Sequence, residues 1–226
     1  PFNFDYKVDD RKSGGLRTIN TYTTNIGETA LKITFGAEVQ ASNYDSKNYG
    51  NNGGELGTLN FDDELKVSSS LIFLQSQLDL KNDWYLTAGL SLNSLTYDIN
   101  REVATAGNGE VGIVNKDFDP QIIPRIAIAK RITTQLTAHA SISSGFSPPT
   151  IEEIRTNEGS INLDLEAEKG LNYEIGLRGN AFNGRLGFDA VAFYYSLKES
   201  ITRQPSEIRE DTFVFKNVVS TDQKGL

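Results

Sequence analysis

The sequence predicts an all-β protein whose strands form an antiparallel up-and-down meander. Two observations carry this prediction. Stretches with period-2 alternation, rich in Thr, Ile, Leu, Tyr and Phe, recur along the chain, and the gaps between them alternate between short and long. In a barrel that crosses an outer membrane, the turns on the periplasmic rim are tight and the loops on the outer rim are long. The chain is therefore predicted to be a transmembrane β-barrel or a segment of one.

Nine strands are expected, and several are longer than the roughly five or six residues that are usual in globular proteins. They also exceed the roughly 9 to 11 residues that a tilted strand needs to cross a bilayer. The short gaps are residues 26–29, 81–83, 132–133 and 182–184, and the long gaps are residues 45–65, 100–120, 147–168 and 200–211. The expected strands cover residues 16–25, 30–44, 66–80, 84–99, 121–131, 134–146, 169–181, 185–199 and 212–220.

The alternation within each strand separates an apolar face from a polar face, and we expect the apolar face to contact lipid and the polar face to line the lumen. The residues expected to face lipid are Leu31, Ile33, Phe35, Leu86, Leu90, Tyr173, Ile175 and Leu177. Glu174 and Arg178 share the polar face of one strand, and His139 shares the polar face of another. Charged side chains do not belong in hydrocarbon, so these three residues are expected to face the lumen.

Composition limits the possible functions. The net charge of −8 argues against binding to nucleic acid, which needs a basic surface. The chain has no cysteine, and His139 is its only histidine, without neighbours at metal-ligand spacing, so neither a metal site nor an enzyme is predicted and no cofactor is expected. The hydrophobic fraction of 38% and the mean hydropathy of −0.38 fit a barrel, but they also leave open a soluble all-β ligand- or carbohydrate-binding module.

Two acidic clusters, Asp9-Asp10 and Asp62-Asp63-Glu64, could in principle bind calcium in a loop. Neither has the alternate-position ligand spacing of a dedicated calcium site. Both are therefore interpreted as solvated loop charge.

The most specific sequence signal lies in three consecutive runs. Residues 145–154 read GFSPPTIEEI, residues 162–168 read NLDLEAE, and residues 172–179 read NYEIGLRG. These runs resemble the GFxPPTxEE, NPxLxPE and YExG patterns in the barrels of TonB-dependent outer-membrane receptors. Leu163 and Ala167 stand where the family usually has proline, which affects the stiffness of a loop more than the fold. Weaker matches at residues 71–75, 86–90 and 215–226 extend the resemblance from about residue 16 to residue 226.

The resemblance implies a receptor in the outer membrane of a Gram-negative bacterium. Such receptors import a scarce nutrient, most often a ferric siderophore or a similar large chelate, with energy from the inner-membrane TonB complex. Their barrels have about 22 strands and enclose an N-terminal plug, since a barrel of that size is too wide for side chains to fill. The chain is then expected to be a partial barrel domain over residues 1–226, with nine strands or, if residues 2–8 form another, ten. It would lack the plug domain and the N-terminal region that contacts TonB.

The ligand-binding residues are predicted from the positions of the long gaps. Tyr49, Arg101 and Arg155 fall in gaps assigned to the outer rim. Arginine pairs well with carboxylate-rich chelates, and tyrosine stacks on planar ligands. These three residues are therefore the candidate ligand contacts.

Overall fold

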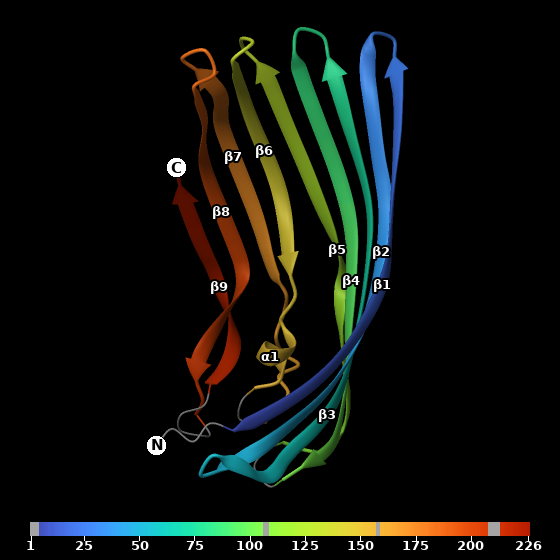
Figure 1. Cartoon of the computed structure of the whole chain (residues 1–226), viewed down its shortest axis with the longest axis vertical. Coiled ribbons are helices and arrows are strands. Elements are labelled where there is room, and N and C mark those ends of the chain that lie inside the picture. Colours follow the sequence, from blue (N-terminus) through green and yellow to red (C-terminus); the bar gives the residue numbers. More distant parts are fainter. Residues whose placement is uncertain (1–4, 106–108, 157–158, 208–212) are drawn as a thin grey trace.

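The chain forms one antiparallel sheet of nine strands, seen in a computed structural model that describes residues 5–105, 109–156, 159–207 and 213–226. Each strand pairs with the next one along the chain (Figure 1), which confirms the predicted meander. The strands are β1 (Tyr6–Ile26), β2 (Thr29–Asn52), β3 (Glu55–Leu80), β4 (Trp84–Ala104), β5 (Gly112–Arg131), β6 (Leu136–Ser147), β7 (Glu168–Ala181), β8 (Leu186–Pro205) and β9 (Phe213–Gly225).

Four short turns lie together at one end of the sheet, at the top of Figure 1. In the turn between β1 and β2, Gly27 has a φ of 61°, and in the turn between β3 and β4, Asn82 and Asp83 have φ values of 57° and 59°. Glycine enters this left-handed region without a steric penalty, and Asn and Asp tolerate it better than most residues. The tight turns therefore form where the sequence predicts them.

At the opposite end, which we call the outer end, the strands run further than predicted. β2 continues to Asn52 and β3 begins at Glu55, so residues 45–65 are mostly strand rather than the predicted long loop. β4 and β5 likewise occupy much of residues 100–120. The predicted loop lengths were wrong here because a backbone ladder continues through polar residues that no longer show a clear alternation. Residues 148–167, between β6 and β7, do form a long connection.

The ends of the sheet and its one helix complete the fold. Residues 6–8 do not form part of a tenth strand, because β1 runs without interruption from Tyr6 to Ile26; residues 1–4 lie outside the described residues. In the described ranges the only helix is α1 (Ile151–Ile154), a single turn between β6 and β7. No helix in the described part of the chain is long and apolar enough to cross a membrane. β1 and β9 form the two edges of the sheet.

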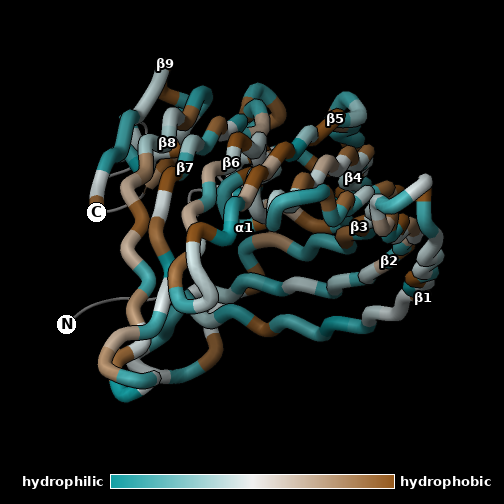
Figure 2. Tube along the Cα trace, turned by 90° about the horizontal axis from the view of Figure 1, so that it is seen from above, coloured by the Kyte–Doolittle hydropathy of each residue, from teal (hydrophilic) through white to brown (hydrophobic). Residues whose placement is uncertain are grey.

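The sheet follows an arc with α1 on its concave side (Figure 2). Near the short turns the convex face carries an apolar band that nothing in the described chain covers. Phe35, Leu90, Tyr173, Ile175 and Leu177, all predicted to face lipid, are exposed in this band. The other three predicted residues, Leu31, Ile33 and Leu86, lie on the same face. Leu31 pairs with Leu78, Leu78 pairs with Leu86, and Ile33 is two residues from Leu31.

In the outer half of the sheet, beyond Ile72 on β3 and Leu92 on β4, the apolar face changes side. Leu86, Leu90 and Leu92 lie on the convex face of β4, whereas Leu95, Tyr97 and Ile99 are buried on its concave face. β4 pairs with β3 in unbroken register through this region, so the apolar positions pass from even to odd numbers. The buried core of the chain thus lies on the concave face at the outer end.

On β5 the apolar side chains also move to the concave face, but there the change comes from a β-bulge. Its register with β4 shifts between the pairs Asn93–Gln121 and Leu95–Phe118, which leaves one additional residue on β5. A bulge of this kind changes the face to which the following side chains point. Phe118 is therefore buried on the concave face, where it meets Tyr97 edge-on with ring centroids 5.8 Å apart.

Candidate functional site

The candidate site is the concave face at the outer end, where residues 148–167 fold into the arc. We call this segment the inner loop; its residues 157 and 158 lie outside the described residues. Two prolines, Pro148 and Pro149, follow β6 and cannot donate backbone hydrogen bonds to continue the ladder. Thr150 then caps α1: its hydroxyl accepts a hydrogen bond from the Glu153 N–H at 3.3 Å, and the Thr150 N–H donates to the Glu153 carboxylate at 2.6 Å.

An apolar cluster joins the inner loop to the central strands. Ile154 and Leu165 of the loop are each 1% exposed, so their side chains are fully removed from water. Burial of a leucine or isoleucine stabilises a fold by about 1.5–3 kcal/mol. The cluster contains Leu65, Leu95, Tyr97, Ile99 and Phe118 from β3 to β5, and Ile154, Leu165 and Ala167 from the inner loop or its end.

Tyr97 adds a hydrogen bond to this contact. Its hydroxyl donates to the Pro149 carbonyl at 2.8 Å in a buried position. Burial of the phenol, with smaller contributions from Tyr44, Glu153 and Glu152, raises the pKa of Tyr97 to about 12. The phenol therefore stays neutral and able to donate throughout the neutral and mildly alkaline range.

A buried ion-pair network fixes the middle of the inner loop. The Arg101 guanidinium donates to both carboxylate oxygens of Asp63, from Nε at 2.6 Å and from Nη2 at 2.8 Å, and Arg155 Nη1 donates to Asp63 Oδ2 at 3.2 Å. Arg101 also donates to the Gly159 carbonyl, and both guanidinium groups lie over the Phe61 ring at 4.8 and 5.5 Å. The Asp63 side chain is 0% exposed, so its charge is balanced entirely by protein groups. The interpretation of Asp63 as solvated loop charge was wrong, because the inner loop folds over it.

The inner loop is also attached to the opposite side of the arc. The Asn162 side chain donates to the Phe215 carbonyl of β9 at 2.9 Å. The Asn217 side chain accepts from the Glu166 N–H at 2.8 Å and donates to the Glu166 carbonyl at 2.9 Å. The Ile201 N–H of β8 donates to the carboxylate of Glu168, the first residue of β7, at 2.8 Å. The inner loop thus connects β3 and β4 to β9 across the concave face.

The three predicted ligand contacts occupy different environments. Arg101 lies in β4 and Arg155 directly follows α1, and both are buried against Asp63. Tyr49 lies in β2, opposite Tyr6 of β1, on the face that also carries Lys47. Only Arg155 is in a loop, so the structure corrects the expected loop position of Tyr49 and Arg101. It brings Arg101 and Arg155 together and leaves Tyr49 apart from them.

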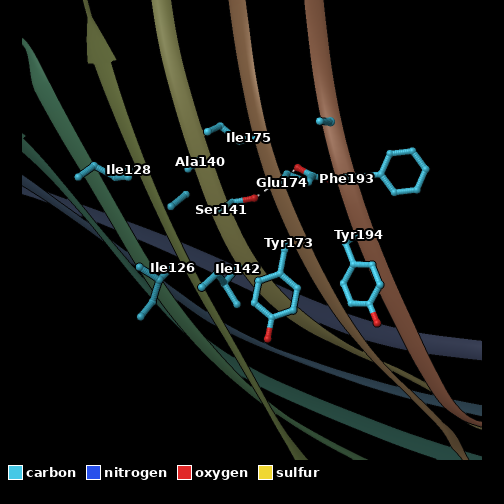
Figure 3. A pocket seen from close by; sticks show the side chains of 12 residues that line it. Ile126, Ile128, Ala140, Ser141, Ile142, Tyr173, Glu174, Ile175, Phe193 and Tyr194 are labelled. Atoms are coloured by element: carbon cyan, nitrogen blue, oxygen red, sulfur yellow. Dashed lines mark hydrogen bonds between the residues drawn. The ribbon is translucent and has the colours of Figure 1, made fainter. Parts of the chain in front are cut away.

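The three residues predicted to face the lumen share the concave-side positions of β6 and β7. Glu174 accepts hydrogen bonds from Ser141 at 3.3 Å (Figure 3) and from Asn172 at 2.7 Å. Arg178 pairs with Asp189 of β8, with Nη2 2.6 Å from the carboxylate. His139 lies opposite Gly176 in the register, where its ring occupies the space that a side chain would fill. Glu174 and Arg178 therefore have partners on neighbouring strands rather than each other.

Exposed charges border the inner loop on the β1 side. Lys7 Nζ lies 3.0 Å from Asp9 and 3.8 Å from Glu152 of α1. Burial opposes the ionisation of Asp9, but the hydrogen bond from Ser46 and the charge of Lys7 outweigh it and lower the pKa of Asp9. Among the described residues, no group of three or more His, Asp or Glu side chains could hold a metal ion. The groups available to a ligand here are ammonium, carboxylate and hydroxyl groups.

Sequence reasoning missed Asp63, Tyr97 and Asn217 as residues that organise the site. A signal for the first two was present, since the apolar positions of β3 and β4 change parity at about residues 67–71 and 92–95. Such a change means that the opposite face becomes buried. No comparable signal marks Asn217, whose partner Glu166 is 51 residues away in the sequence.

An open meander of long strands with an apolar convex face and a loop folded against its concave face is a segment of the wall of an up-and-down β-barrel. A family model described as TonB dependent receptor-like, beta-barrel matches residues 1–226. The chain belongs to this family. The resemblance in the sequence is thereby confirmed.

Similar proteins support the same fold. The metal-pseudopaline receptor CntO of Pseudomonas aeruginosa is 24% identical over 144 residues, which are 62% of this chain and 19% of CntO. The ferric citrate transporter FecA, in its unliganded form, superposes with a TM-score of 0.75 at 13% identity over 93% of this chain and 31% of FecA. The pyoverdine outer membrane receptor FpvA from Pseudomonas aeruginosa, bound to pyoverdine, gives 0.71 at 17% identity over 98% of this chain and 33% of FpvA.

The chain therefore spans between about a fifth and a third of the length of these proteins. All three are receptors or transporters rather than enzymes, in agreement with the sequence prediction. The alternative of a soluble all-β binding module is not favoured by these matches.

Proposed function

We propose that the chain forms part of the wall of an outer-membrane receptor that imports a metal chelate, with a ferric siderophore as the first candidate. The observation that carries this proposal is the inner loop, which is fixed inside the arc at the end of the sheet away from the short turns. In an outer-membrane barrel that end faces the outside. A ligand arriving from outside would therefore meet the inner loop and the strand ends around it.

The chemical class of the ligand is supported by the relatives. Their names describe a receptor for metal-pseudopaline, a transporter of ferric citrate and a receptor bound to pyoverdine. Chelates of this kind present carboxylate or other oxygen donors, which lysine and arginine bind well. The family resemblance also implies that the TonB complex supplies the energy for import, through a region N-terminal to this segment.

The ligand-contact role of Tyr49, Arg101 and Arg155 stays a prediction. Because Arg101 and Arg155 are buried against Asp63, their replacement would alter the position of the inner loop as well as any direct contact. Triple alanine substitution is expected to weaken chelate binding without preventing barrel assembly. Asp63→Asn is the matched control, because it loosens the same loop and keeps all three residues.

The test uses the intact receptor that contains this chain. We expect it in the outer-membrane fraction with heat-modifiable migration on a gel, and we expect the purified receptor to bind at least one of ferric citrate and ferric pyoverdine. Uptake of the bound chelate should be lost in cells without TonB while binding is retained. Recovery of the receptor in the soluble fraction, or absence of binding to a wide panel of ferric chelates, would contradict the proposal.

A further inference from the structure

The convex face carries an apolar groove across β5 to β8, with a volume of about 450 Å³ (Figure 3). Its shape follows from one row of the register, in which Ala140 of β6 lies opposite Ile175 of β7, and Ile175 lies opposite Ala192 of β8. The small alanine side chains leave a hollow on each side of Ile175. Ile126 and Ile128 close the side on β5.

Two tyrosines form the outer end of this groove. Tyr173 and Tyr194 lie opposite each other in the register, with ring centroids 6.2 Å apart. Figure 3 shows their hydroxyl groups pointing the same way, away from Ile175 and Ala140. Tyrosine is favoured at the level of lipid headgroups because its ring is apolar and its hydroxyl needs a polar partner.

Two lysines lie just beyond the tyrosines. Lys169 of β7 and Lys198 of β8 are directly opposite each other, four residues from Tyr173 and Tyr194 respectively, so strand alternation places all four on the convex face. Both lysines are exposed, and among the described residues neither forms an ion pair. Like charges directly opposite on neighbouring strands are destabilising. On β9 the same face carries Lys216, Asp222 and Lys224, so the charge on the convex side of β7 to β9 stays positive.

On the strands β3 and β4, the described residues at the outer border of the apolar band have a different arrangement. On β3 and β4 the corresponding convex positions hold hydroxyl groups, in Ser68, Ser70, Ser94 and Thr96. The lysines further out on that side are paired, with Lys66 3.7 Å from Glu64 and Lys12 3.8 Å from Asp10. Of these two regions of the described chain, only β7 and β8 therefore carry lysines without an ion pair next to an apolar groove.

We infer that the groove and the Lys169–Lys198 pair together bind an anionic, phosphate-bearing membrane lipid. One acyl chain lies between Ile128 and Ala192, and the headgroup phosphate lies between the two ammonium groups. The lipid offsets the repulsion between the lysines and fills the hollow that Ala140 and Ala192 leave. The inference rests on the proposed membrane location. A second copy of the chain packed through the same groove about a two-fold axis would add its own Lys169 and Lys198 and leave the positive charge unbalanced.

The experiment measures lipid retention by the intact receptor in detergent with native mass spectrometry. The probes are phosphatidylglycerol and phosphatidylcholine with identical acyl chains. Each basic residue near a membrane surface contributes about 1 kcal/mol toward anionic lipid, so we expect roughly tenfold to thirtyfold preference for phosphatidylglycerol. The double variant Lys169→Gln/Lys198→Gln should lose this preference. The control Lys12→Gln/Lys66→Gln changes the net charge equally on the same face and should keep it.

A third variant separates the groove from the headgroup contact. Ala192→Leu fills the hollow on β8 with an apolar side chain and should reduce retention of both lipids. Absence of a preference in the parent receptor, or equal loss in the control, would overturn the inference. A dimer that dissociates on Ala192→Leu would also overturn it, because the groove would then be an interface between copies. A receptor absent from the outer-membrane fraction would instead contradict the proposed function, before any lipid is added.

Discussion

The two halves of β3 to β5 use the same strands in opposite ways. Near the short turns, the apolar side chains are on the convex face and exposed, as with Ile72 at 61% and Leu90 at 51%. At the outer end the apolar side chains are on the concave face and buried, as with Leu65 at 1% and Ile99 at 2%. The first half depends on an apolar environment that the chain does not supply. The second half supplies its own, through the inner loop.

This difference shows that one sheet can combine an uncovered apolar face with a core of the kind found in soluble proteins. Convex and concave faces exchange roles within a few residues, through a change of parity in β4 and a bulge in β5. The consequence is that substitutions in the two halves should respond to different conditions. Outer-half variants should affect the inner loop in any medium, and convex-band variants should matter only in lipid or detergent.

The largest effect is expected from removal of the carboxylate that balances the buried arginines. Asp63→Ala leaves Arg101 and Arg155 without their shared partner, and breaking a buried pair in this way costs about 3–5 kcal/mol. Limited proteolysis of the intact receptor should then cleave within residues 148–167, while the barrel stays assembled. Glu64→Ala, one residue away with a side chain that is 46% exposed, should leave the cleavage pattern unchanged. Equal sensitivity of the two variants would show that the network does not hold the inner loop.

The convex band is tested by a charge placed in it. Ile175→Arg should cost roughly 2–4 kcal/mol in a lipid folding assay, because an arginine there faces hydrocarbon. Ser141→Arg, on the concave face of the neighbouring strand, should cost clearly less. Gly176 is not a suitable control, since a Cβ at that position would lie 2.6 Å from the His139 ring. Similar penalties for Ile175 and Ser141 would contradict the assignment of faces.

The buried phenol of Tyr97, outside the apolar band, predicts a loss of stability at high pH. Its pKa of about 12 lies above the value of 10.0 for a free tyrosine, so the unfolded segment loses its proton first as the pH rises. The stabilisation is complete below pH 10 and is lost between pH 10 and about pH 12, by about 2–3 kcal/mol. Protease sensitivity of the inner loop should rise in this window, and Tyr97→Phe should remove that rise. An unchanged pH profile in the variant would assign the effect to other groups.

The smallest effect is expected at the cap of α1. Thr150→Ala removes the hydroxyl that accepts a hydrogen bond from the Glu153 N–H, and this half of the capping box is worth about 1 kcal/mol. Hydrogen exchange should become faster at the Glu153 amide, which loses its hydroxyl acceptor, and remain unchanged on β4. Thr150→Ser keeps that acceptor and should behave like the parent chain. If Thr150→Ser exchanged as fast as Thr150→Ala, the cap would not be the stabilising contact.

The meander, the positions of the tight turns and the alternation of apolar and polar residues near the short turns could all be predicted from the sequence. These features are local: turn residues such as Gly27 and Asn82 act on their own backbone, and a period of two is visible within any single strand. The resemblance to the family rests on equally local runs, above all residues 145–154. The concave-face positions of His139, Glu174 and Arg178 follow from the same alternation.

The positions of the buried charges and of the core depend on contacts that form only in the folded sheet. Asp63 and Arg155 are 92 residues apart, and Glu166 and Asn217 are 51 apart, so no local pattern reports that they meet. The outer strand segments looked like loops because their convex side chains are polar, although backbone pairing and the buried concave side chains of Leu65 and Phe118 maintain them. Burial of Arg101 depends on a loop from another part of the chain folding over it, and such a contact is fixed only when the whole sheet has formed.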